Sequence, residues 1–522
     1  MNKTLFASIR SALRSPAATN DAGAPAYRFS AEAALAQLAC TGCLSQTYYA
    51  TAETQLDRVL ELARQVDTDF LARTALYSRN VAHMKDMPAL LCAVLASRNL
   101  DRLNEIFPQV INNARLLRNF VQVIRSGVTG RKSLGSAPRR LVRQWLVGAD
   151  DETLLVATIG NDPSLADVIK MVHPKPRCAR REAFYAWIIG RPHDPALLPA
   201  LVQEFEAWKA DRSRPLPRVP FRLLTAEPLT TQQWTEVALH ANWTTTRMNL
   251  NTFARHDVLK NAELVKLLAR RLSDAKLVRQ AKVFPYQLLA AFLNAESNIP
   301  QALTLALQDA LEVATEQVPA LQGNVFVAID ISGSMHSPVT GQLKGRSSKV
   351  RCVDAAALIG AAIARKNPLA TIIPFHDVAL TQSLNPRDSV MTNARMLASL
   401  PSGGTDCSAP LRRINAINAS PSLVIIVSDN ESWCHAHNRQ TTPVMQEWSK
   451  IKARRPDAKL VCIDLAPNTT TQAPDRADIL NIGGFSDEVF TLVKNFADSK
   501  ASPDHWVQRI NQQVLRASAR IA

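Results

Sequence analysis

The chain has 522 residues, of which 47% are hydrophobic and 20% are charged. This composition is ordinary for globular proteins and excludes a largely disordered chain, and the longest apolar runs are too short to cross a bilayer. Lys and Arg (61) outnumber Asp and Glu (45), which gives a net charge of +16. An excess of this size favours polyanionic partners, most often nucleic acid.

The cysteines and the first residues bear on the compartment in which the protein works. Eight cysteines are spread thinly, so we expect reduced and mostly buried thiols rather than a disulfide framework. The beginning of the sequence has no continuous apolar segment of the kind found in secretory signals. These features predict a cytoplasmic protein. Residues 1–25, rich in Ala, Ser and Asn, are expected to have little fixed structure.

Up to about residue 320 the predicted elements are helices. Apolar residues recur at helical spacing over residues 55–64, and Pro88 suits the first turn of a helix over residues 88–98. The region from residue 262 to residue 318 continues the pattern, whereas the proline-rich residues 211–222 are expected to form a loop. Stacked helix pairs, of the kind that build solenoids or rings, fit this region best.

Positive charge is concentrated between residues 115 and 143, where eight basic and no acidic residues occur. Pro138 can start a helix on which Arg139, Arg140 and Arg143 occupy two adjacent faces, within reach of successive phosphates. A solvated basic helix face would have the same composition. For each cation alone, solubility therefore explains the charge as well as binding does.

After residue 320 strands alternate with helices. Four apolar strands are predicted over residues 324–331, 370–375, 423–428 and 460–464, with helices over residues 353–365 and 387–400 between them. This alternation predicts a doubly wound parallel sheet. Ligands bind beyond the carboxyl ends of such strands. Asp330 ends the first strand and Asp429 follows the third, so both are expected at that edge.

Oxygen donors gather at the same edge. Asp330, Ser332 and Ser334 form the pattern D-x-S-x-S, and Thr405 lies in a glycine-containing loop. With Asp429 they offer only carboxylates and hydroxyls, the set that Mg²⁺ prefers and that Mn²⁺ also accepts. A polar hydrogen-bonded cluster without metal is the alternative. No zinc site is predicted at Cys434, His435 and His437, because no suitable fourth ligand follows them.

These residues resemble the metal-ion-dependent adhesion site of the von Willebrand factor A domain family. That family draws a D-x-S-x-S motif, a threonine and an aspartate from three loops. Each has a match here at the expected position. The resemblance implies an ion that accepts an acidic group from outside.

The order in which the two regions occur indicates a narrower family than either region does alone. A long helical region followed by an A domain resembles the TROVE family, which includes the Ro ribonucleoprotein autoantigen and its bacterial relatives. Six stretches that resemble the family lie between residue 46 and residue 431: QTYY at residues 46–49, AHMKDMPALL at 82–91, VHPKP at 172–176, FPY at 284–286, GGTDCS at 403–408 and DNE at 429–431.

This resemblance implies a particular architecture. It implies an all-α HEAT-like helical ring, the TROVE domain, over residues 26–320 and a doubly wound α/β A domain over residues 321–522. It also implies a monomeric RNA-binding scaffold without catalytic activity. Family members bind small structured Y RNA on a basic outer surface and single-stranded 3′ ends of misfolded RNA in a central hole. They act in noncoding-RNA quality control, and bacterial members can tether RNA to an exoribonuclease.

The candidate RNA contacts combine the charged stretch with the VHPKP motif, in which His173 can stack on a base or donate to a phosphate. A structural histidine explains His173 equally well. The candidates are Arg115, Arg118, Arg125, Arg131, Lys132, Arg139, Arg140, Arg143, Lys170, His173, Lys175 and Arg177.

Two other functions compete with the RNA scaffold. The metal site could make the A domain a metal-dependent protein-interaction module, with RNA incidental. An RNA-processing enzyme would need two metals or a positioned general base, and only one metal site is predicted. The tryptophans do not decide the matter, since they are spaced like core aromatics rather than base-stacking platforms. They are Trp145, Trp187, Trp208 and Trp234.

Overall fold

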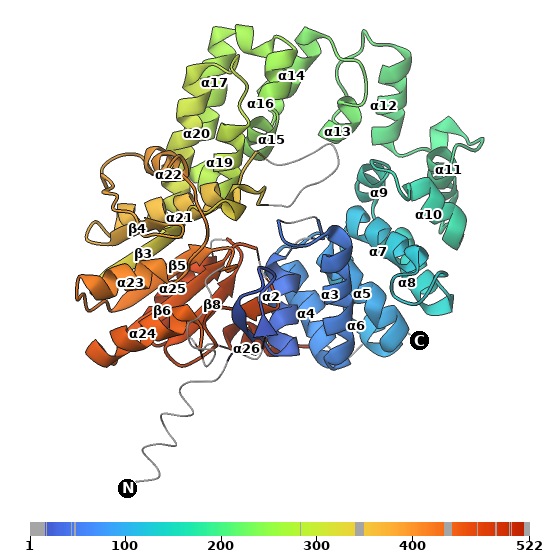
Figure 1. The fold of residues 1–522 in the computed structure, drawn as a ribbon. Helices are drawn as coiled ribbons and strands as arrows, with labels where there is room; N and C mark the ends of the chain where they lie inside the picture. The colour runs from blue at the N-terminus through green and yellow to red at the C-terminus, as the bar shows by residue number, and fades with distance from the viewer. Residues whose placement is uncertain are drawn as a thin grey trace. The chain divides into compact units, whose positions relative to one another are not determined.

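The computed structural model describes residues 16, 18–42, 44–45, 48–281, 283–339, 349–432, 441–466, 468–485, 488–500, 502 and 504–515 (Figure 1). The chain divides into two compact units. Unit 1 comprises Met1–Arg58 and Ala241–Gln508, and unit 2 comprises Val59–His240 and Arg509–Ala522. The predicted domain limits at residues 26 and 320 stay predictions. No described helix is both long and apolar enough to cross a membrane.

Unit 2 is helical. Asp67 begins one helix by accepting hydrogen bonds from the Asp69 and Phe70 amides, and Ser164 begins another through a capping box with Asp167. The helices of this unit are α4 (Thr68–Asn80), α5 (Met87–Arg98), α6 (Leu100–Val110), α7 (Ala114–Ser126), α8 (Ser136–Gly148), α9 (Asp151–Ala157), α10 (Leu165–Val172), α11 (Ala179–Ile188), α12 (Ala200–Ala210), α13 (Phe221–Leu224) and α14 (Thr231–His240); α3 (Ala52–Gln65) runs into it from unit 1.

The helices of unit 2 pack in a stack. Contacts join helices two apart along the chain, α4 with α6, α5 with α7, α6 with α8 and α7 with α9. Phe107 of α6 and Phe120 of α7 meet edge to face, with ring centroids 5.1 Å apart. This pattern is that of stacked helix pairs, and it confirms the helical prediction for this part of the chain.

Unit 1 holds the remaining helices before residue 320. The Glu312 carboxylate fastens one of them to a later helix by accepting the Val390 amide at 2.7 Å. Arg365 lies 3.5 Å from the same carboxylate. These helices are α2 (Ala31–Thr41), α15 (Trp243–Met248), α16 (Leu250–Arg255), α17 (Ala262–Ser273), α18 (Ala275–Ala281), α19 (Pro285–Leu293) and α20 (Gln301–Ala314).

A five-stranded parallel sheet forms the centre of unit 1, in the order β4-β3-β5-β6-β8. The predicted doubly wound sheet is confirmed. β8 was not predicted, because Ile-Leu-Asn-Ile-Gly is neither continuously apolar nor alternating. The strands are β3 (Val325–Asp330), β4 (Thr371–Phe375), β5 (Leu423–Ser428), β6 (Lys459–Asp464) and β8 (Ile479–Gly483); the helices are α21 (Cys352–Lys366), α22 (Val390–Ala398), α23 (Ala409–Ala416), α24 (Pro443–Arg454), α25 (Glu488–Ala497) and α26 (His505–Asn511).

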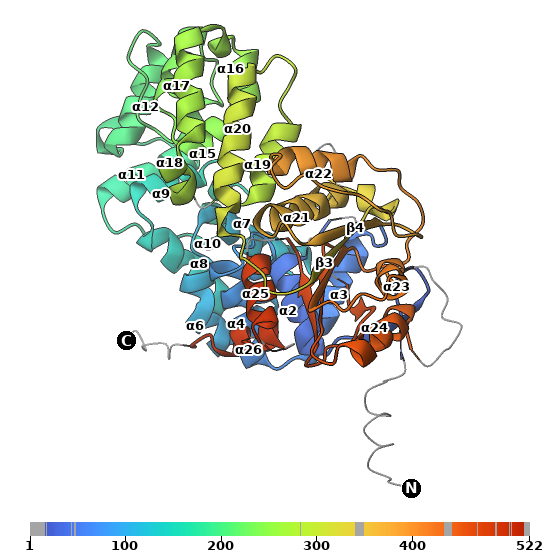
Figure 2. The ribbon, with the colours of Figure 1, turned by 90° about the vertical axis from the view of Figure 1, so that its left-hand side faces the viewer.

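Helices cover both faces of the sheet (Figure 2). Phe326 and Ala328 of β3 share one core with Trp448 of α24. On the other face α21 lies so close to β3 that a Cβ at Gly360 would come within 2.8 Å of Ile329 Cδ1. Because neighbouring residues of a strand point to opposite faces, a strand buried on both sides is apolar throughout.

A small antiparallel sheet joins the two ends of unit 1. β1 (Ala18–Thr19) pairs with β2 (Pro25–Arg28), and β2 pairs with β7 (Thr470–Thr471). Little fixed structure was expected over residues 1–25, and for residues 18–25 this expectation was wrong. These residues pair locally with β2, and Asn20 and Ala22 are also held by hydrogen bonds to Ser432 and Glu431, more than 400 positions away, which no local pattern reveals.

Candidate metal centre and cationic surface

The predicted metal ligands lie where the direction of strand succession reverses. The chain runs from β3 outward to β4 and returns on the other side of β3 to form β5. Asp330 ends β3 and Asp429 follows β5, so the two carboxylates belong to adjacent strands. Such a switch point leaves a crevice at the carboxyl ends of the strands, which is where open α/β sheets bind ligands.

Hydrogen bonds hold the D-x-S-x-S turn in place. The Ser332 amide donates to Asp330 Oδ1 at 2.8 Å, and Ser428 Oγ donates to Asp330 Oδ2 at 2.5 Å. The hydroxyls of Ser332 and Ser334 lie 3.3 Å apart. A side-chain hydrogen bond joins Ser334 to Asp429. The structure therefore brings four of the five predicted ligands into one network.

The loop that carries Thr405 is attached to this turn. The Gly333 amide donates to the Gly403 carbonyl at 3.0 Å, and the Asp406 amide donates to the His376 carbonyl at 3.0 Å. Thr405 is buried, with 5% of its surface exposed. All five predicted ligands are therefore buried residues on loops at the same end of the sheet.

Burial shifts the acidity of the two carboxylates. Burial raises the pKa of Asp330, and hydrogen bonds from Ser332 and Ser428 offset part of the shift. Burial, and then repulsion by Asp330, raises the pKa of Asp429 to about 7. A divalent cation held by these residues would offset the cost of burying both carboxylates, because it would supply positive charge.

The donor set fits a hard cation. Asp330, Ser332, Ser334, Thr405 and Asp429 would hold Mg²⁺ or Mn²⁺, and the bound ion would supply a positive charge that attracts an acidic group. Among the described residues no group of three or more His, Cys, Asp or Glu side chains is arranged to hold a metal. Cys434, His435 and His437 lie outside the described residues.

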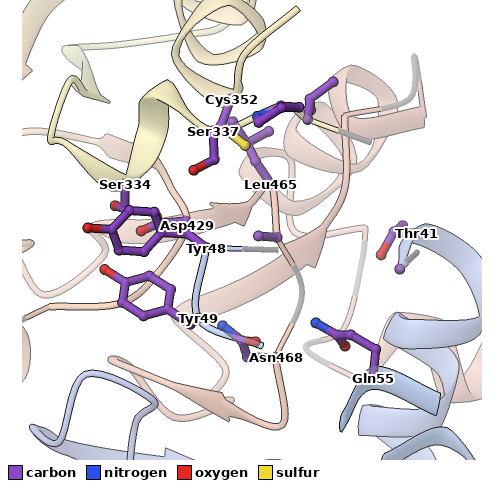
Figure 3. Close-up of a pocket in the computed structure, with 14 residues that line it drawn as sticks. Thr41, Tyr48, Tyr49, Gln55, Ser334, Ser337, Cys352, Asp429, Leu465 and Asn468 are labelled. Atoms are coloured by element: carbon purple, nitrogen blue, oxygen red, sulfur yellow. The ribbon is translucent and has the colours of Figure 1, made fainter. Parts of the chain in front are cut away.

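A small cavity of about 40 Å³ opens over Ser334 and Asp429 (Figure 3). Tyr48 and Tyr49 form one wall, with ring centroids 4.8 Å apart in an edge-to-face arrangement. Tyr48 is 58% exposed. The cavity has room for the end of a side chain, since about one water fills 10–15 Å³ of such volume. The QTYY stretch at residues 46–49 was noticed in the sequence, but Tyr48 and Tyr49 were not predicted to belong to this site.

The N-terminal hairpin fastens the loop that follows Asp429. Glu431 accepts the Ala22 amide at 3.1 Å and the Asn468 amide group at 2.6 Å, and it is 1% exposed. Asn20 Nδ2 donates to the Ser432 carbonyl at 2.9 Å. Burial, followed by repulsion from Asp21 and Asp429, raises the pKa of Glu431 to about 8. These residues were not predicted as part of the site.

In unit 2 three of the predicted RNA contacts are structural. Arg118 donates to the Ala157 carbonyl at 2.7 Å, and burial lowers the pKa of its guanidinium. Arg131 donates to the Ala96 carbonyl and Arg143 to the Val172 carbonyl. Each is half-buried and ties its own segment to a carbonyl 29 or more residues away.

The other nine candidates have exposed side chains. Arg115 lies 3.2 Å from Asp86, and Arg140 lies 3.4 Å from the Asn104 side-chain oxygen. His173 ends α10 with a left-handed backbone, φ = 49°, which turns the chain toward Lys175. The nine are Arg115, Arg125, Lys132, Arg139, Arg140, Lys170, His173, Lys175 and Arg177.

Comparison with known proteins gives the family context. The model of the Ro60 vWA domain matches residues 324–497. A curated relative, the RNA-binding protein RO60 of Deinococcus radiodurans, is 24% identical over 521 aligned positions, which cover 92% of this chain and 94% of the relative.

The fold has a counterpart among solved structures. The crystal structure of the Deinococcus radiodurans RO (RSR) protein superposes with a TM-score of 0.63 at 20% identity, over 90% of this chain and 100% of that one. The likeness covers helical region and sheet together. Residues 324–497 thus match the Ro60 vWA domain model, and the resemblance of the chain to the Ro ribonucleoprotein family is confirmed.

Proposed function

We propose that this protein is an RNA-binding scaffold that holds structured RNA on the cationic surface of unit 2. The observation that carries the proposal is the set of nine exposed basic side chains, drawn from two separate stretches of one compact unit. Phosphates bind such cations with an affinity that depends steeply on salt. The similarity to a protein named as RNA-binding supports the same function.

The proposed ligands follow from the family resemblance. They are a small structured noncoding RNA of the Y type and misfolded RNAs with single-stranded 3′ ends. The protein would act as a non-catalytic cytoplasmic monomer in RNA quality control, and it would pass RNA to an exoribonuclease. Sequencing the RNA that copurifies with the protein after crosslinking tests this part. Recovery of no structured small RNA above a basic control protein would count against it.

The test of RNA binding is a variant in which Lys132, Arg139 and Arg140 are all changed to alanine. With a structured hairpin RNA at low salt we expect a loss of affinity of roughly 100-fold and a salt dependence flatter by about two to three ions. An equal loss of charge at Arg191, Arg218 and Arg222, three exposed arginines of unit 2 outside the predicted set, is the control. Equal losses in both variants would contradict a defined surface.

A second candidate function uses the metal centre. The cavity over Ser334 and Asp429 favours a metal-dependent interaction in which the ion takes one acidic side chain of a protein partner. A partner captured in Mg²⁺ and lost both on chelation and in Asp330→Ala, with RNA binding unchanged, would support it. A partner that remains bound after chelation would exclude this role for the ion.

A further inference from the structure

An open groove on unit 2 combines an apolar floor with a cationic rim. Phe107 of α6 and Leu141 and Trp145 of α8 belong to its apolar lining, here called the floor. Arg140 of α8 and, from the segment after α10, Lys175 and Arg177 belong to its cationic lining, here called the rim. The groove thus joins the two stretches of sequence that supplied the candidate RNA contacts.

The charge on the rim is uncompensated. None of the residues that line the groove is acidic. Within the described part of the chain neither Lys175 nor Arg177 forms an ion pair, and the same holds for Arg140. In contrast, Arg180 and Arg181, a few residues further on, both pair with Asp151. A groove of this charge is complementary to an anion.

Trp145 differs from the tryptophans of the core. Trp208 and Trp234 are 1% and 4% exposed, whereas Trp145 is only half-buried and lines the groove. The expectation that all four are core aromatics was therefore wrong for Trp145, and it was also wrong for Trp187, which is half-buried. An aromatic face that stays accessible beside cations is the arrangement on which unpaired bases stack.

The groove is held in shape without a ligand. Arg143 donates to the Val172 carbonyl and so fixes α8 to the end of α10, next to the segment that carries Lys175. Tyr185 donates to the Leu146 carbonyl at 2.9 Å and fixes the end of α8 to α11. The tryptophan and the cations across the groove are therefore positioned relative to one another before RNA arrives.

We propose that this groove takes one unpaired RNA base, which stacks on Trp145 while the flanking phosphates contact Arg140, Lys175 and Arg177. The inference rests on the proposed RNA-binding function and adds a preference to it. Bases inside a duplex are stacked and paired and cannot enter, whereas a bulged or terminal nucleotide can. The protein would thereby favour structured RNAs that carry an unpaired nucleotide beside a helix.

The test compares three hairpin RNAs of one sequence: fully paired, with one bulged adenosine, and with an abasic ribose at the bulge. The abasic RNA keeps every phosphate and removes only the base. We expect wild-type protein to bind the bulged adenosine about 10-fold more tightly than the abasic RNA, as expected for one stacked base. Trp145→Leu should abolish this difference, and Trp145→Phe should retain most of it.

Trp187→Leu is the matched control, because Trp187 is also half-buried but does not line the groove. It should keep the discrimination. A second measurement needs no variant: a photoreactive 5-iodouridine at the bulge should crosslink to α8 of the wild-type protein. Crosslinks confined to other helices would overturn the base site.

The remaining outcomes separate this inference from the proposed function. In one outcome, wild type binds all three hairpins with equal affinity, while the triple variant at Lys132, Arg139 and Arg140 still loses affinity. That result would contradict the base site and leave the proposed RNA binding intact. No binding of any hairpin would remove both. Displacement of RNA from the groove by polyglutamate, with no discrimination between the hairpins, would assign the groove to an acidic peptide instead.

Discussion

The metal centre and the cationic surface are organised in opposite ways. In the metal centre Asp330 is fully enclosed and both of its oxygens accept hydrogen bonds. On the surface Lys132 and Arg139 are exposed and form no ion pair with any described residue. The ligands of the first site are buried and joined by hydrogen bonds, whereas the cations of the second are exposed side chains. A rigid site suits one small ion, whereas adjustable cations suit the varied surface of RNA.

The largest effect is expected at the rigid site. Asp330→Ala removes a buried ligand and should weaken Mg²⁺ binding by more than the roughly 10–100-fold that the loss of an outer partner costs. Wild type at 100 times the dissociation constant of Mg²⁺ should gain about 2.7 kcal/mol in the free energy of unfolding. Thermal unfolding with and without Mg²⁺ measures the stabilisation of wild type by the ion and its loss in Asp330→Ala. Asp457→Ala, at an exposed carboxylate, is the control, and an unchanged Mg²⁺ response in Asp330→Ala would exclude the site.

The next-largest effect is a difference in stability between two arginine variants of the same helix. Arg118 and Arg125 both lie on α7, but only Arg118 donates to a distant carbonyl, that of Ala157. Arg118→Ala should cost about 1.5–3 kcal/mol of unfolding free energy, the usual value of a charged hydrogen bond. Arg125→Ala should cost less than about 0.5 kcal/mol. Urea unfolding of both variants measures these losses. Equal losses of unfolding free energy would contradict a structural role for Arg118 that Arg125 lacks.

A smaller effect concerns a buried carboxyl beside the metal centre. Asp464 is 4% exposed, only one of its oxygens has a hydrogen-bond partner among the described residues, and burial raises its pKa well above the ordinary value. A carboxyl with a raised pKa binds its proton better in the folded state, so its contribution to stability is lost as the pH rises toward that pKa. In EDTA, wild type should therefore lose stability as the pH rises through the range above the ordinary carboxyl pKa.

Asp464→Asn cannot ionise, so its stability should decline less steeply with pH than that of wild type. The exposed Asp457→Asn should leave the decline unchanged, because a neighbouring Arg455 lowers the pKa of that carboxyl and it stays ionised throughout. Parallel pH profiles for wild type and Asp464→Asn would show that Asp464 does not titrate in this range.

The smallest effect returns to α7 and concerns RNA. Arg125→Ala should reduce the salt dependence of hairpin binding by about 0.7–0.9 ions, the value of one phosphate contact, with a loss of affinity of a few-fold. Arg118→Ala should leave the salt dependence unchanged, because its guanidinium is occupied by a backbone carbonyl. Binding titrations at four salt concentrations measure the slope. The reverse result would exchange the roles of the two arginines.

The two sites also differ in how far the sequence predicted them. D-x-S-x-S is a local motif, and the ends of β3 and β5 could be found from apolar runs, so the sequence alone placed the candidate metal ligands at one edge of the sheet. Ser428, which donates to Asp330, was counted only as the end of a strand. For the basic residues, the sequence shows the charge of each side chain but not the group that it binds. Arg118 and Arg131 bind carbonyls that are 39 and 35 residues away along the chain.

The discontinuous composition of unit 1 has a consequence for the order in which the protein assembles during translation. Val59–His240, almost all of unit 2, leaves the ribosome before β3 has been made. The N-terminal hairpin must wait for its partner, since Arg28 pairs with Thr470. At 5–20 residues per second this wait lasts roughly 20–90 s. The hairpin that fastens the metal loop is thus among the first segments synthesised and among the last to find its place.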